Sequence, residues 1–209
     1  MILTKRVLDV FRTFKKIEQS CVLKNGLLHT KALNNTAYCK ANFQVESDST
    51  YFISDIGALL KLANSGSVLK DLGDRYLLTN VDGAEYVIEP AKPDSVITPK
   101  EELKLPTIDH KFNFNSELVR EINADIGLVQ LMQKDDSFSI SIECQGDRTE
   151  ILKTKREFNG EFCIEFNNKQ VSKLGNVDMN IYVTKQGVAQ FSARDASMII
   201  AIESNLFNY

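Results

Sequence analysis

Basic residues near the start of the chain have the type and spacing to bind phosphate groups. Residues 3–18, LTKRVLDVFRTFKKIE, have the apolar periodicity of an amphipathic helix, in which each residue turns the chain by roughly 100°. On that helix Lys5, Arg12, Lys15 and Lys16 fall nearly opposite the apolar face, with Leu8 among them. Such a face can hold phosphates or can simply be solvated, and the helix alone leaves both interpretations open.

The other helices expected from the pattern, at residues 55–64, 116–124 and 167–174, also carry cations. The cations are Lys61 in the first helix, Arg120 in the second, and Lys169 with Lys173 in the third. Glutamates flank Arg120 on both sides, which weakens it as a phosphate contact. Most acids lie instead at expected strand ends and turns. The net charge of −3 therefore does not exclude a surface that attracts phosphate.

The sequence contains no recognisable signature of catalysis. It has neither a glycine-rich phosphate loop nor a GxSxG nucleophile motif, and its two histidines, His29 and His110, are far apart. Its four cysteines form no CxxC pair, so they are expected to be buried reduced thiols rather than metal ligands. We therefore expect no catalytic residue, no metal site and no cofactor, and a protein that is not an enzyme.

The bulk composition is typical of a globular protein. Hydrophobic residues make up 43% of the 209 residues and charged residues 25%. No apolar run is long enough to span a membrane, and MILTKRVLDVF lacks the features of a signal peptide. These features predict a protein of the cytoplasm with no membrane partner.

The same order of elements occurs in both halves: a helix, four strands, a second helix and three strands. In the first half the strands are expected near 21–24, 27–32, 36–45, 50–54, 67–72, 75–80 and 84–89. In the second half they are expected near 127–134, 137–145, 148–157, 160–166, 177–184, 187–193 and 196–204, after a short strand at 112–114. This repetition predicts two similar α+β domains, at residues 1–89 and 107–209.

A proline-rich segment separates the two halves. Residues 90–106, PAKPDSVITPKEELKLP, contain all four prolines of the chain. Proline lacks a backbone donor and fixes φ, so it disfavours both helices and central strands. The segment is expected to be an extended interdomain connector.

With these features, the chain resembles the sliding clamp of T-even bacteriophages, the DNA polymerase processivity factor. The resemblance is clearest in residues 3–43, a helix followed by a hairpin through Lys24-Asn25-Gly26. It returns in residues 176–204, where Lys185-Gln186-Gly187 forms a turn before a last apolar strand. Between these ends only the pattern of elements matches. The chain is somewhat shorter than the family's, and the loss falls in the second half.

The resemblance implies an architecture and a function. Clamp domains place helices inside a ring and antiparallel sheets outside it, and three chains of two domains each would close the ring as a head-to-tail homotrimer. The ring would encircle double-stranded DNA without reading its sequence and tether the replicative DNA polymerase, after a clamp-loader complex placed it there. It would act in the host cell cytoplasm at replication forks. The basic residues named above would face the DNA.

The resemblance also implies two protein-binding surfaces. The last strand of the first domain, with Tyr86 and Ile88, would meet a second-domain edge strand near Ile151 and Leu152 in the next subunit. Polymerase and clamp-loader tails would bind an apolar groove beside the connector. The candidates for this groove are Val96, Ile97, Leu103, Leu105, Leu206, Phe207 and Tyr209. These residues could equally anchor the connector to its own domains.

One other class of protein fits the same residues. A two-domain viral structural or regulatory binding protein, with the basic helix as solvated surface, would show the same composition and element order. Assembly state separates the two interpretations, because only the clamp requires a ring.

Overall fold

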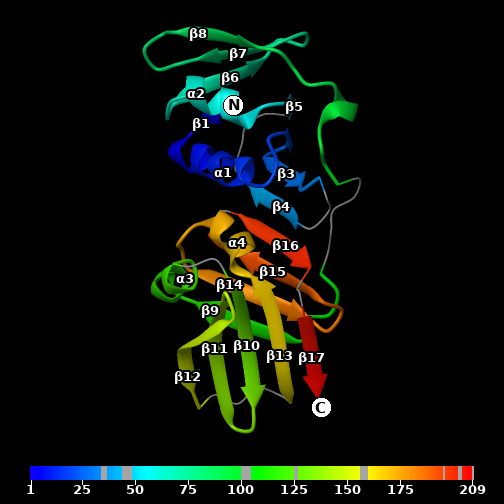
Figure 1. Ribbon diagram of the computed structural model, residues 1–209. Helices are drawn as coiled ribbons and strands as arrows, with labels where there is room; N and C mark the ends of the chain where they lie inside the picture. The colour runs from blue at the N-terminus through cyan, green and yellow to red at the C-terminus, as the bar shows by residue number, and fades with distance from the viewer. Residues whose placement is uncertain are drawn as a thin grey trace. The chain divides into compact units, whose positions relative to one another are not determined.

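The chain folds into two compact units, Met1–Leu103 (unit 1) and Lys104–Tyr209 (unit 2) (Figure 1). The computed structural model describes residues 1–33, 37–43, 49–99, 105–124, 127–155, 160–194 and 196–201, and the backbone of 204–208. The division between the units falls inside the segment expected to be the connector.

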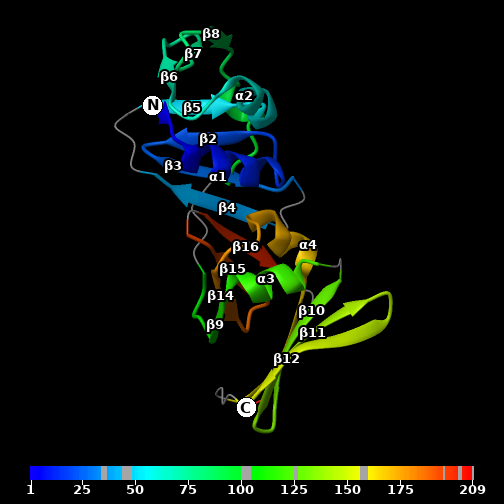
Figure 2. The same cartoon turned by 90° about the vertical axis from the view of Figure 1, so that its left-hand side faces the viewer.

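In its described residues, unit 1 contains eight strands in two antiparallel sheets and two α-helices. Its elements are β1 (Ile2–Leu3), α1 (Lys5–Lys15), β2 (Cys21–Lys24), β3 (Leu27–Lys31), β4 (Ala37–Asn42), β5 (Thr50–Ile53), α2 (Ile56–Leu62), β6 (Ser67–Asp71), β7 (Tyr76–Thr79), β8 (Glu85–Ile88) and the 3₁₀ turn η1 (Pro93–Ser95). The strand orders are β5-β2-β3-β4 and β1-β6-β7-β8. Helix α1 runs beside β2 and β3 (Figure 2).

Unit 2 repeats this arrangement. Its elements are β9 (His110–Phe114), α3 (Ser116–Ile122), β10 (Leu128–Lys134), β11 (Ser137–Cys144), β12 (Asp147–Thr154), β13 (Glu161–Asn167), α4 (Asn168–Val171), the 3₁₀ turn η2 (Ser172–Leu174), β14 (Met179–Thr184), β15 (Val188–Ser192), β16 (Ser197–Ala201) and β17 (Ser204–Asn208). The strand orders are β12-β11-β10-β13-β17 and β9-β14-β15-β16.

The strand orders confirm the duplication expected from the pattern, and they reveal a second repeat inside each unit. Each unit consists of two successive strand–helix–three-strand halves. The first strand of each half pairs with the sheet of the other half: β1 joins β6, and β5 joins β2. In unit 2, β9 joins β14 and β13 joins β10. This exchange ties the two halves of a unit into one core.

Two strands were missing from the expectation. Strand β1 has only two residues, and Leu3 was assigned to the helix that follows. Strand β17 follows two residues whose structure is not described, and it pairs with β13. By contrast, the Asn25-Gly26 hairpin is confirmed, because both residues have the positive φ angles, 50° and 77°, that this turn requires.

The core of unit 2 is built from aromatic rings that come from both of its sheets. Phe112 of β9 stacks on Phe138 of β11 with ring centres 5.6 Å apart. His110 of β9 lies 4.3 Å from the ring of Phe162 of β13, and only 5% of His110 is exposed. Burial lowers the pKa of His110, because the charged imidazolium loses its hydration there.

The helix starts follow local capping rules. Thr4 and Asp55 cap α1 and α2 by accepting the backbone N–H groups of Val7 and Ala58. Helix α3 begins at Ser116, as expected, and its cap is Asn115, which accepts the N–H of Leu118. An asparagine carbonyl accepts such a bond as well as a serine hydroxyl does.

Two of the four cysteines are less buried than expected. Cys21 and Cys39 are buried, whereas Cys144 and Cys163 are half-buried, and all four are free thiols. Burial raises the pKa of the Cys21 thiol, so it stays protonated at neutral pH.

Candidate nucleic-acid interface

The cationic face expected on the first helix is present on α1. Lys5, Arg12, Lys15 and Lys16 are all exposed. The opposite face buries Val7, Val10, Phe11 and Phe14, which fixes the rotation of the helix and keeps the basic side chains in solvent. Arg6 is also exposed on α1; sequence reasoning left it out because the helical angle places it off the basic face.

Leu8 is buried although it falls among the basic residues of this helix. It is only 2% exposed. Helix α1 packs against α2, so the flank between the apolar and basic faces is covered as well.

Arg12 differs from the lysines around it, because its charge is partly neutralised. Its guanidinium donates to the carboxylate of Asp9, one turn earlier on α1. The pair is exposed, so it contributes little to stability. It does lower the net charge that Arg12 offers to an outside anion.

The last turn of α1 and helix α2 border an open hollow of about 540 Å³. Arg12, Lys15, Lys16, Gly57, Leu60 and Lys61 line it. Lys61 was expected to add to the basic face from the second helix, and the packing of α1 on α2 brings it to the same hollow as the cations of α1. Gly57 and Leu60 were not anticipated, because nothing in their types signals a binding site.

The cations of unit 2 are arranged differently. Arg120 is exposed on α3 with exposed Glu117 and Glu121 beside it. Lys169 is exposed on α4, but Lys173 is half-buried and lies in the 3₁₀ turn η2. A single helix over 167–174 was therefore wrong, because α4 ends after one turn at Val171. The spacing that would place Lys169 and Lys173 on one helical face is lost.

The connector is attached to unit 1 where it is described. Val96 is 7% exposed. The backbone of Ile97 donates to Ser20 Oγ (3.0 Å), and its carbonyl accepts from Thr30 Oγ1 (3.3 Å). Of the other groove candidates, Leu105 is half-buried, Leu103 and Tyr209 lie outside the described residues, and the side chains of Leu206 and Phe207 are not described. For Val96 the side chain serves to anchor the connector.

Tyr86 and Ile88, the contact residues expected in unit 1, lie on a sheet edge. Strand β8 is the last strand of its sheet, paired only with β7 in the described structure. Tyr86 and Ile88 are half-buried, whereas Val87 between them is 63% exposed. The exposure of Val87 on the outward face of this edge strand was not predicted from the sequence.

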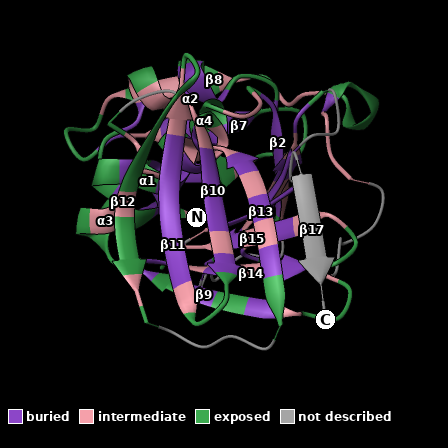
Figure 3. Ribbon diagram, turned by 60° about the horizontal axis from the view of Figure 1, so that its bottom comes forward, coloured by how far each residue is buried: buried purple, intermediate pink, exposed green. Residues whose placement is uncertain are grey.

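Ile151 and Leu152, the contact residues expected in unit 2, also lie on an edge. Strand β12 pairs only with β11 in the described part of its sheet, and it is exposed along most of its length while β10 and β11 are buried (Figure 3). The register with β11 shifts at Ile151, which has no partner residue, and Leu152 is 37% exposed. This irregularity is a β-bulge, a common feature of sheet edges.

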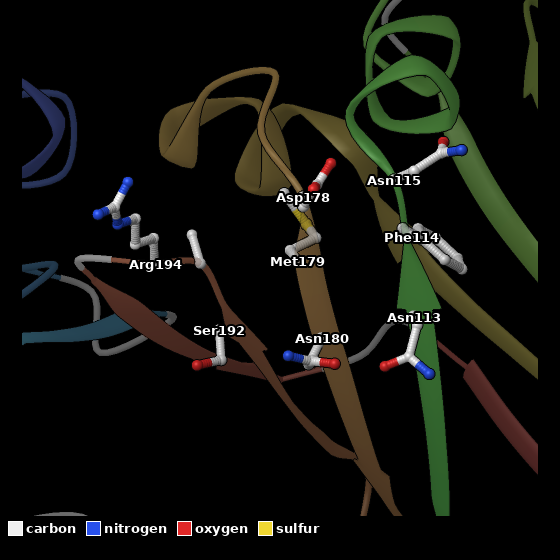
Figure 4. A pocket seen from close by; sticks show the side chains of 9 residues that line it. Asn113, Phe114, Asn115, Asp178, Met179, Asn180, Ser192 and Arg194 are labelled. Carbon is white, nitrogen blue, oxygen red and sulfur yellow. The ribbon is translucent and has the colours of Figure 1, made fainter.

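A second hollow, in unit 2, has a different character (Figure 4). It measures about 480 Å³ and is crossed by Asn113, Asn180 and Ser192, which are register neighbours on β9, β14 and β15. Its one basic side chain, Arg194, is matched by one acid, Asp178, which accepts a backbone N–H at the start of α3. The lining is polar but nearly neutral, so it does not resemble a phosphate site.

The chain as a whole is similar to solved structures of three proteins. It aligns with proliferating cellular nuclear antigen (PCNA) from Entamoeba histolytica over 94% of each chain, with a TM-score of 0.69 and 11% identity. It aligns with the PCNA2–PCNA3 complex of Sulfolobus tokodaii over 97% of this chain and 98% of that chain, with a TM-score of 0.71 and 11% identity. The DNA polymerase III β subunit of Thermotoga maritima matches 96% of this chain and 63% of its own, with a TM-score of 0.71 and 12% identity.

These alignments establish the fold. The chain has the α+β fold of sliding clamps, as the resemblance in the sequence implied. No protein-family model and no curated protein matches the sequence, so the T-even bacteriophage type stays a prediction. Among the described residues no helix has both the length and the apolar character needed to cross a membrane.

Proposed function

We propose that the protein is a sliding clamp, a ring that encircles duplex DNA and tethers the replicative DNA polymerase. One observation carries the proposal: a chain with the clamp fold concentrates exposed cations on its helices. The clamp contacts the phosphate backbone and leaves base edges unread, so it can slide over any sequence. The role is mechanical, and no side chain is assigned to catalysis.

More specifically, we propose that the protein is a sliding clamp of the T-even bacteriophage type, acting at replication forks in the host cytoplasm. The supporting residues are 3–43 and 176–204, where the sequence resembles that family. On this proposal a clamp loader opens and places the ring. The tails of the loader and the polymerase bind beside the connector, where Ile97 and Leu105 remain candidates for contact.

The proposed ring is a cyclic homotrimer. Two clamp units per chain give six units from three chains, and an interface that repeats head to tail closes on itself. The edge strands β8 and β12 are the proposed contact, with Val87 and Leu152 as exposed apolar residues on the two sides. Because Ile151 bulges, a partner strand would pair with the regular stretches on either side of it.

Primer extension with the cognate polymerase and clamp loader tests the function. A clamp lengthens the product made in each binding event, because it keeps the polymerase on the template. The control omits the loader, which should remove the gain on closed circular templates. Products of unchanged length with all components present would reject the proposal.

A further inference from the structure

The hollow between α1 and α2 collects positive charge from two helices. Arg12 and Lys15 lie in the last turn of α1, Lys16 caps that helix, and Lys61 lies in the last turn of α2. Helix α1 therefore directs its C-terminal end here, whereas α2 borders the hollow from its first turn, at Gly57, to Lys61. The partial negative charge of a helix C-terminus favours the cations at the end of α1.

Gly57 gives Lys15 its place in this hollow. A Cβ atom on residue 57 would lie 2.9 Å from both Cε and Nζ of Lys15, and 3.0 Å from Oδ1 of Asp55. The Lys15 ammonium thus lies against the first turn of α2, in space that any other residue at position 57 would occupy. The φ angle of Gly57 is not in the left-handed region, and the atoms nearest to such a Cβ are the flexible end of the Lys15 side chain, so the contact shows where Lys15 lies rather than a requirement for glycine.

The positive charge of the hollow is largely unneutralised. Arg12 is paired with Asp9, but no acid in the described part of the chain forms an ion pair with Lys15, Lys16 or Lys61. Like charges held this close repel one another unless an anion enters between them. The hollow is therefore suited to an anion with several acceptor oxygens, such as a phosphodiester.

Unit 2 does not reproduce this concentration of charge. The helices of unit 1 with their cap residues carry six basic residues and two acids: Lys5, Arg6, Arg12, Lys15, Lys16 and Lys61, and Asp9 and Asp55. The helices of unit 2 and the turn η2 carry three basic residues and two acids: Arg120, Lys169 and Lys173, and Glu117 and Glu121.

From these observations we infer that the hollow lined by Lys15, Lys16 and Lys61 is a discrete phosphate-binding site, and that each chain holds duplex DNA mainly through unit 1. The ligand is a phosphodiester of the DNA backbone, an identity that rests on the proposed clamp function. Unit 2 then contributes a weaker contact. Around the proposed ring, strong DNA contacts from each unit 1 would alternate with weaker contacts from each unit 2.

Matched charge deletions test whether unit 1 contributes more than unit 2 to DNA binding. The unit 1 variant is K15A/K61A and the control is R120A/K169A; each removes two exposed cations from helices. Binding to a short duplex is measured by fluorescence anisotropy over a series of salt concentrations. The salt slope is the steepness with which the logarithm of the affinity falls as the logarithm of the salt concentration rises. It should fall by about one unit for every phosphate that the variant no longer neutralises. We expect a slope change of about two and at least tenfold weaker binding at low salt for K15A/K61A.

For R120A/K169A we expect less than half of that slope change. Equal changes in the two variants, or a larger one in R120A/K169A, would overturn the inference. Unchanged binding by both variants would overturn it as well.

Amide chemical shifts test the site itself, with inorganic phosphate as the probe. Phosphate should shift the amides of Gly57, Lys61 and their neighbours, and K15A/K61A should abolish these shifts because it removes two of the cations that line the hollow. Retained circular dichroism will show that K15A/K61A still folds. Shifts that persist in K15A/K61A, or that cluster on unit 2, would overturn the site.

The two sources of phosphate give different results. If the hollow binds only free phosphate, K15A/K61A abolishes the shifts but leaves duplex affinity unchanged, and the inference about DNA fails. The proposed function has a separate readout. Primer extension that gains nothing from the protein rejects the clamp, whereas unequal salt slopes would still support the site.

Discussion

At the residue scale, small differences in neighbours decide what each cation can do. Arg12 and Lys15 both lie in the last turn of α1, yet Arg12 is paired with Asp9 while Lys15 reaches across Gly57. Gly127 of unit 2 is more tightly constrained than Gly57, because a Cβ there would lie 2.4 Å from the backbone carbonyl oxygen of Glu143. Substitutions at these glycines would act through crowding.

The buried histidine makes unit 2 sensitive to acid. Burial lowers the pKa of His110 below the usual 6.5, with opposing effects from Asp109, which raises it, and Lys185, which lowers it. The unfolded chain thus takes up this proton more readily than the folded one. Stability is complete above about pH 6.5 and decreases as the pH falls through the interval between the two pKa values, by at most about 1.4 kcal/mol per pH unit.

We expect the substitution His110→Phe to remove this part of the pH dependence. Urea unfolding of wild type and variant at about pH 7.5 and about pH 5 measures it. The difference in unfolding free energy between the two pH values should be smaller in the variant. The same difference in both proteins would contradict the assignment to His110.

At the element scale, the packing of α1 on α2 and the attachment of the connector shape the surface of unit 1. Helix α1 contributes most of the exposed cations, and α2 closes the hollow beside them. The connector follows β8 and returns along unit 1. There the N–H of Ala91 donates to the carbonyl of Phe52 at the β5 edge, and both polar groups of Ile97 are hydrogen-bonded.

Removing the hydroxyl groups of Ser20 and Thr30 should release this connector locally. The variant S20A/T30V loses both side-chain partners of Ile97, at a cost of about 1–2 kcal/mol. Hydrogen exchange of the Ile97 amide should become about five to thirty times faster. The control is S95A, which removes only an exposed bond to the Lys92 carbonyl; similar exchange rates in both variants would contradict the attachment.

The basic face of α1 as a whole should determine retention on DNA. In the variant K5A/R12A/K16A we expect weaker binding and a salt slope flatter by about two to three units, since each cation that neutralises a phosphate contributes about one. If the pairing with Asp9 already prevents Arg12 from neutralising a phosphate, the slope should change by about two units rather than about three. A control that removes the exposed Lys70, Lys92 and Lys134, away from the helices, should bind as wild type does. Unchanged affinity in the α1 variant would exclude this face.

At the scale of the whole molecule, the proposed assembly uses β8 and β12, which lie at the ends of their sheets in the described structure. These two strands occupy different places in the repeat, so the proposed contact would join two chains head to tail. Such an interface closes into a ring when the rotation per chain fits, and it removes the aggregation hazard of two open edges.

Charge placed on the β12 edge should break the ring. In the variant I151E/L152E two carboxylates would be buried at the proposed contact, so we expect a mass near 23.6 kDa instead of three times that value. Light scattering after gel filtration measures the mass. The control is V177E, whose site is 40% exposed, close to the 37% of Leu152, but lies outside β12. A trimer that survives I151E/L152E would refute this interface.

Much of the fold could be read from the sequence because its signals are local. The apolar period of α1, the Asn25-Gly26 turn and the Asp55 cap each depend on a few adjacent residues. The repeated order of elements followed from those signals, and with it the two similar units. An error occurred at residues 167–174, where one α-helix was expected and α4 instead changes into the 3₁₀ turn η2 after Val171.

The sequence by itself determined which residues are basic and which helical face carries them. Only the tertiary structure decided which cations converge, because Lys15 and Lys61 are 46 residues apart and meet through the packing of α1 on α2. It also placed Gly57 in the lining of the hollow, and it buried Val96, for which the sequence left a groove contact and an anchor equally open. Periodicity reports the environment of one element at a time, whereas a site between two elements depends on how both are packed.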